Sequence, residues 1–129
     1  MRRAAIAIVC LGAAWLVAVP ASAGNDPGRL LVTGTEYNLA LSRLKLNPGD
    51  NIIQFQNSGE DAHDMKIQRV GGGTEHAFGK LDAGSDPVSL EMNLKKGATY
   101  ELWCSLTTPV THRDQGMAAT LTVRKHRRP

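Results

Sequence analysis

Residues 88–104 have the sequence VSLEMNLKKGATYELWC, in which two extended segments flank a Lys-Lys-Gly turn. Apolar and polar residues alternate from Val88 to Leu94, and the turn leads into a second segment that ends at Cys104. A period of two places alternate side chains on opposite faces of a β-strand. The stretch therefore predicts two consecutive strands joined by a turn.

The same pattern extends over the rest of the chain. Strong turn signals occur at Asn47-Pro48-Gly49-Asp50 and at Asn57-Ser58-Gly59. Further strands are predicted at 30–35, 38–46 (with Leu44 and Leu46 on one face), 52–56, 63–70 and 118–124. We expect residues 71–87 to form a loop with at most one short strand or helical turn near Phe78. Regularly spaced short strands without a helical stripe predict an all-β fold, a sandwich or a barrel, and about 100 residues suit one antiparallel β-sandwich.

The N-terminus has the pattern of a secretory signal. Met1-Arg2-Arg3 is followed by an apolar run from Ala4 to Val19 and by the small residues Pro20-Ala21-Ser22-Ala23. We expect cleavage of residues 1–23, which leaves a single domain at 24–129 with a basic tail at 124–129 and places the protein in the periplasm or outside the cell. The alternative is an uncleaved membrane anchor, because the apolar run is marginal in length for a span.

Composition and charge narrow the classes of function. A length of 129 residues fits one domain, and 5% aromatic residues with 13 glycines fit short strands and turns. Residues 24–123 carry 9 basic and 12 acidic side chains, so the positive charge resides at the two ends of the chain. We therefore predict no nucleic-acid binding, and we interpret the tail as a solvated terminus.

Signal cleavage would leave Cys104 as the single cysteine, because Cys10 lies within the signal. A lone cysteine in an exported protein is unusual, since a free thiol invites oxidation. Cys104 is a buried inert residue, a metal ligand or a nucleophile.

The residues around Cys104 favour a metal site. Cys104, His112 and Met117 lie in one predicted loop, and His63 begins an earlier strand. A thiolate, two imidazoles and a weak axial thioether are the donors of a trigonal copper site. Soft sulfur donors favour Cu(I), while imidazoles bind both Cu(I) and Cu(II). A copper ligand would also explain the lone cysteine.

From 30 to 123, the chain resembles the cupredoxins, the blue copper proteins of the plastocyanin and azurin type. The resemblance rests on residues 55–59, 63–67, 97–105 and 112–117. It implies a Greek-key β-sandwich, one copper ion that alternates between Cu(I) and Cu(II), one-electron transfer, and the ligands His63, Cys104, His112 and Met117.

Two features depart from the family pattern. Seven residues separate Cys104 from His112, more than in the usual small cupredoxins, and Asp64 stands where the family often has Asn. If the long loop displaced Met117, Met65 would be the alternative axial ligand. We expect Met65, Met92 and Trp103 to pack in the core, and His76 and His126 to face solvent.

Three functions compete. The first is an electron carrier that docks transiently with redox partner proteins near His112, whose imidazole edge we expect at the surface. The second is a copper-binding or copper-delivery protein, although the methionines are dispersed. The third, a copper enzyme, is disfavoured because Trp103 and Ser105 occupy the positions where a multicopper oxidase needs histidines. We therefore predict a monomer that is not an enzyme and has no stable membrane span after cleavage.

Overall fold

A computed structural model describes residues 26–128 of the protein. The predicted signal at residues 1–23 lies outside the described residues. Within 26–128, the structure holds no helix long and apolar enough to cross a membrane.

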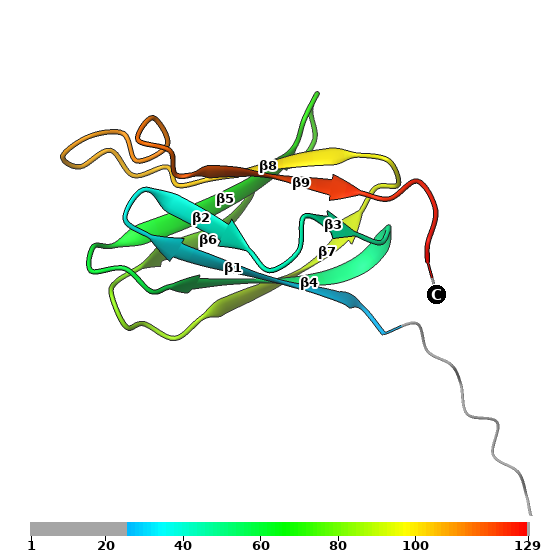
Figure 1. Ribbon diagram of the computed structural model, residues 1–129, viewed down its shortest axis with the longest axis horizontal. Coiled ribbons are helices and arrows are strands. Elements are labelled where there is room, and N and C mark those ends of the chain that lie inside the picture. The colour runs from blue at the N-terminus through cyan, green and yellow to red at the C-terminus, as the bar shows by residue number, and fades with distance from the viewer. Residues whose placement is uncertain (1–25, 129) are drawn as a thin grey trace, which may run out of the picture.

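Two sheets make up the fold (Figure 1). One sheet has the order β2-β1-β4-β7 and the other has the order β3-β9-β8-β5-β6. The strands are β1 (Gly28–Thr35), β2 (Asn38–Leu41), β3 (Lys45–Leu46), β4 (Gly49–Asn57), β5 (His63–Arg69), β6 (His76–Leu81), β7 (Val88–Leu94), β8 (Thr99–Trp103) and β9 (Ala118–Val123). The predicted all-β sandwich is confirmed.

Both sheets are mixed rather than wholly antiparallel. Strand β1 pairs in parallel with β4, and β3 pairs in parallel with β9, whereas the other pairs are antiparallel. Alternation along a strand reports which face is buried and does not report the direction of the neighbouring strand. The antiparallel expectation therefore missed these two pairs.

The core lies between the two sheets and is formed by apolar side chains from both. Ile53 and Phe55 of β4 face Ile67 of β5 and Leu102 of β8, and all four side chains are fully buried. Burial of large apolar side chains contributes about 1.5–3 kcal/mol each to folding. Met65 and Met92 are also in this core, as predicted.

The predicted strand at 38–46 is wrong in its middle. The chain leaves β2 at Leu41, and β3 then pairs with β9 in the opposite sheet. Leu44 lies in this crossing segment and is 70% exposed, while Leu46 is buried. A change of sheet shifts the facing of the side chains, which a single alternating pattern across 38–46 does not reveal.

The weakly patterned stretch 71–87 contains β6, so the expected short strand near Phe78 is correct. Phe78 is buried, and its ring lies edge-on to Phe55 at 6.4 Å between centroids. Strand β6 also pairs with the start of β5, where Leu81 lies opposite His63.

Candidate metal centre

His63 is placed by the start of β5. The pairing of β5 with β6 is irregular between Asp64 and Lys66, so that alternation is broken and His63, Asp64 and Met65 are all buried. Such an irregularity re-aims side chains that regular alternation would send to solvent. It brings His63 to the edge of the core with 0% of its surface exposed.

The loop between β8 and β9 carries the other predicted ligands. The Cys104 N–H donates to the Met117 carbonyl at 3.1 Å, and the Met117 N–H donates to the His112 carbonyl at 3.0 Å. The His112 N–H in turn donates to the Leu106 carbonyl at 3.0 Å. These bonds tie the three residues together, so the long spacing between Cys104 and His112 does not separate them.

Three donor atoms converge at this end of the sandwich. His63 Nδ1 lies 3.2 Å from His112 Nδ1, and Cys104 Sγ lies 3.5 Å from the same nitrogen. One donor atom from each residue lies within 4.8 Å of the others, and all three residues are buried. Metal–nitrogen bonds of about 2.0 Å and metal–sulfur bonds of about 2.3 Å place neighbouring donors about 3–4 Å apart. The donor set thus fits a single ion, with the chemistry that favours copper.

Met117 is buried beside this cluster through its backbone bonds to Cys104 and His112. A Cβ built on Gly34 would lie 3.2 Å from Met117 Cε, so the thioether methyl packs closely against β1. Met117 as axial ligand remains a prediction, as does the alternative, Met65.

The expectation that His112 presents its edge to solvent is wrong. His112 is 2% exposed, and its Nε2 lies 3.1 Å from the Thr108 carbonyl oxygen. A carbonyl can only accept, so this contact favours the His112 tautomer with its proton on Nε2, in which Nδ1 can bind an ion. The residues inserted between Cys104 and His112 fold over the ring, which a count of loop residues does not show.

Glu36 approaches His63 from behind and was not predicted. It lies in the turn between β1 and β2, and its Oε1 is 3.5 Å from His63 Nε2. The gap is too long for a good hydrogen bond, and among the described residues His63 Nε2 has no hydrogen-bond partner. The same Oε1 accepts from the N–H groups of Glu60 at 2.6 Å and Asp61 at 3.0 Å.

These contacts keep Glu36 ionised. Backbone N–H donors, that of Asp61 foremost, lower the pKa of Glu36 from 4.5 to about 2. A carboxylate behind a ligating imidazole orients the ring and raises its basicity. Nothing in the local pattern around Glu36 signals this role, because the contact depends on how two distant turns meet.

The Glu36→Gln variant should have a higher reduction potential when loaded with copper, because a negative charge beside His63 favours Cu(II) over Cu(I). Since Glu36 is 41% exposed, solvent screening should limit the shift to tens of millivolts. Voltammetry measures the shift, and the control is Glu60→Gln, which removes a carboxylate from the segment between β4 and β5 whose N–H groups donate to Glu36. Equal potentials in all three proteins would contradict this role of Glu36.

Asp64 joins β5 to the residue after Cys104. Asp64 Oδ1 accepts from the Ser105 N–H at 2.5 Å, and Oδ2 accepts from Ser105 Oγ at 2.5 Å. The departure from Asn thus preserves a link between the two ligand-bearing segments and adds a negative charge near Cys104.

Burial raises the pKa of the Cys104 thiol above its usual range.

The residue before Cys104 lies differently from what the sequence predicts. Trp103 is only half-buried, contrary to the expected core position, because neighbouring residues on β8 face opposite ways. The Arg113 guanidinium lies 4.9 Å above the Trp103 ring and pairs with Glu101 at 2.5 Å.

No family model and no curated protein sequence matches this chain. Solved structures do match: auracyanin B has a TM-score of 0.54 at 18% identity, with 74% of this chain and 88% of that chain covered. Auracyanin A, a "blue" copper protein from Chloroflexus aurantiacus, has a TM-score of 0.53 at 16% identity over 76% of this chain and 99% of its own. A multicopper oxidase matches at 0.51 and 18% identity over 78% of this chain but only 43% of its own length. The fold is therefore of the cupredoxin type.

Proposed function

We propose that the protein is an exported, mononuclear copper protein that carries single electrons between redox partners and is not an enzyme. The observation that carries the proposal is the buried convergence of His63 Nδ1, Cys104 Sγ and His112 Nδ1 in a cupredoxin-type sandwich. The bound ion would supply reversible one-electron chemistry by alternating between Cu(II) and Cu(I).

The chain's own residues would keep this site rigid. The Thr108 carbonyl holds the tautomer of His112, Asp64 anchors the residue after Cys104, and Glu36 lies behind His63. A site whose donors are held by hydrogen bonds changes little between oxidation states, so little reorganisation opposes electron transfer.

Copper delivery is the second candidate. A delivery site must pass its ion to another set of ligands, which favours exposed donors. His63, Cys104 and His112 are at most 2% exposed, and Met65, Met92 and Met117 are also buried. This burial favours the carrier over the delivery protein.

A copper enzyme finds less support. Among residues 26–128, His63, Cys104 and His112 form the one cluster of such side chains suited to a metal. Trp103 and Ser105 flank Cys104 and offer no imidazole for a route to further metal ions.

Transient docking of a redox partner is proposed at the loop over His112. Val110 in this loop is 41% exposed, and Leu106 is partly buried against the core. A small apolar surface of this kind suits weak encounters between redox proteins. Export and a monomeric state belong to the same proposal.

The proposal is tested on protein purified after export and loaded with Cu(II). We expect one copper per chain, an intense visible thiolate-to-Cu(II) band and a reversible one-electron wave in voltammetry. Copper without the visible band, or rapid loss of Cu(I) to a competing chelator, would favour binding or delivery over electron transfer.

Replacing Met117 by leucine should keep the visible band, because the axial thioether is a weak ligand. The potential should rise by at least about 60 mV, which is a tenfold change in the one-electron equilibrium. Voltammetry of Met117→Leu and of the core control Met92→Leu measures the difference. An unchanged potential in Met117→Leu together with a shift in Met65→Leu would assign the axial position to Met65.

A further inference from the structure

The C-terminal tail is folded against the sandwich. The Arg124 N–H donates to the Leu46 carbonyl at 2.9 Å, and Asn47 Nδ2 donates to the Arg128 carbonyl at 3.1 Å. The Arg124 guanidinium also reaches the Lys45 carbonyl at 3.4 Å. These bonds hold the tail beside β3 and the turn before β4, while residues 125–128 stay exposed to solvent, as the sequence predicts.

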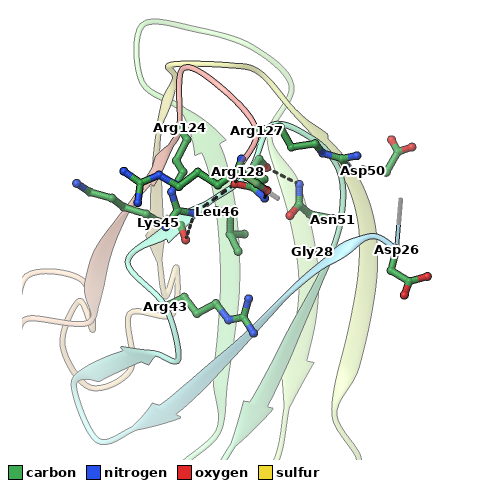
Figure 2. Close-up of a pocket in the computed structure, with 11 residues that line it drawn as sticks. Asp26, Gly28, Arg43, Lys45, Leu46, Asp50, Asn51, Arg124, Arg127 and Arg128 are labelled. Atoms are coloured by element: carbon green, nitrogen blue, oxygen red, sulfur yellow. Dashed lines mark hydrogen bonds between the residues drawn. The ribbon is translucent and has the colours of Figure 1, made fainter. Parts of the chain in front are cut away.

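The folded tail completes a basic pocket of about 320 Å³ (Figure 2). Its five basic side chains come from two parts of the chain and are Arg43, Lys45, Arg124, Arg127 and Arg128. Asp26 and Asp50 also line the pocket, which leaves a net charge of +3. By contrast, residues 24–123 have three more acidic than basic side chains.

None of these five cations forms an ion pair with a carboxylate among residues 26–128. Other basic residues do find partners, for example Lys66 with Glu75 at 2.8 Å and Arg113 with Glu101. With five cations and only two carboxylates lining the pocket, the like charges repel each other, and an anion bound among them would reduce that repulsion.

The walls of the pocket are formed by ordered backbone. Asn51 is 1% exposed, and its amide donates to the carbonyls of Asn47 and Gly49 at 3.1 and 2.7 Å. A Cβ on Gly28 would clash with the Asn51 side chain, so glycine is required where β1 starts. The basic side chains therefore surround a base formed by Asn51 and Gly28, which hydrogen bonds and close packing hold in place.

We propose that this pocket binds phosphate-bearing anions. Four of its five cations are arginines, whose planar guanidinium groups bind phosphate oxygens through paired N–H donors. The size of the pocket suits a compact, multiply charged group. Two sources share this chemistry: soluble polyphosphates and the headgroups of anionic phospholipids.

The position of the pocket is compatible with either source. Strand β9 runs from Ala118, beside Met117, to Val123, beside the tail, so the pocket and the metal centre lie at opposite ends of the sandwich (Figure 1). Asp26 and Gly28 line the pocket, so the described chain begins at this end. A bound anion would leave the metal end accessible.

Calorimetric titration with inorganic pyrophosphate, and sedimentation with vesicles of phosphatidylglycerol or of phosphatidylcholine alone, test the proposal on the exported protein without metal. We expect pyrophosphate to bind, phosphatidylglycerol vesicles to bind, or both, and the responding probe identifies the source. Binding should weaken with added salt, because the Debye length shortens from about 10 Å at 0.1 M to about 3 Å at 1 M.

Variants make the test specific to the pocket. The double variant Arg43→Gln, Arg128→Gln should weaken binding by at least about tenfold, the effect of losing one charge-assisted contact. Asp26→Asn should strengthen binding because it removes an opposing charge. The control Arg69→Gln, Lys80→Gln removes the same charge outside the pocket and should leave binding unchanged.

The proposal is overturned if neither probe binds, if the pocket variant and the control lose affinity equally, or if only an acidic peptide such as poly-aspartate binds. None of these readouts uses the metal centre, so their failure leaves the proposed electron-transfer function untouched. Equally, evidence against copper binding would not affect the proposal that the pocket binds anions.

Discussion

The Cys104→Ser variant is expected to lose the visible copper band completely and to bind copper more than about 100-fold more weakly. Substitutions of residues that only hydrogen-bond to metal ligands typically weaken metal binding by about 10–100-fold, so this loss should be larger. A serine hydroxyl is a hard donor that stays protonated at neutral pH, so it replaces neither the charge nor the softness of a thiolate. Absorption spectroscopy and competition with a chelator measure both effects.

The domain itself should stay folded in this variant. Cys104 is fully buried in the core, and the hydroxyl is close to the thiol in size. Burying the more polar group should cost about 1–3 kcal/mol, measured as thermal unfolding without metal. Met92→Leu removes a different buried sulfur and should keep the band. A blue Cys104→Ser protein would exclude Cys104 as the ligand.

Substitution of Asp64 should have the next largest effect on the copper site. Two variants separate the contribution of its charge from that of its hydrogen bonds. Asp64→Asn keeps a carbonyl acceptor for the Ser105 N–H and lets Ser105 Oγ accept from the new amide. The potential should rise by tens of millivolts, because the substitution removes a negative charge that is bonded to the residue next to Cys104.

Asp64→Ala should act on geometry instead. It leaves the Ser105 N–H without its acceptor, which should weaken copper binding by about 10–100-fold and destabilise the fold by about 1–3 kcal/mol. Voltammetry, chelator competition and thermal unfolding distinguish the two variants, with Asp114→Asn as a control in the ligand loop. If Asp64→Asn and Asp64→Ala had the same potential, copper affinity and thermal stability, the charge and the hydrogen bonds of Asp64 would not have separate roles.

Local sequence patterns predicted much of the fold. Strand and turn signals located most strands, and the alternation from Val88 to Leu94 predicted the buried face of β7. Alternation failed at Leu44, where the chain changes sheet, and it did not show the parallel pairings, because both depend on contacts between distant segments.

The metal centre was likewise predictable only in part. The residue types of His63, Cys104 and His112, together with their order, predicted the cluster that the structure brings together. The burial of His112 under Thr108 and the approach of Glu36 to His63 arise from loop conformations. Neither loop has a periodic pattern, so the chemistry of the donors was predictable and their surroundings were not.

If a redox partner docks over His112 as proposed, the Thr108 carbonyl above the ring affects how that partner is selected. An electron entering by this route would cross a peptide layer before it reached the imidazole, so contact with the partner and coordination of the ion would belong to different residues. Thr107, Pro109 and Val110 could then differ between related proteins. Such differences would change which redox proteins dock, while the residues that bind the ion stayed the same.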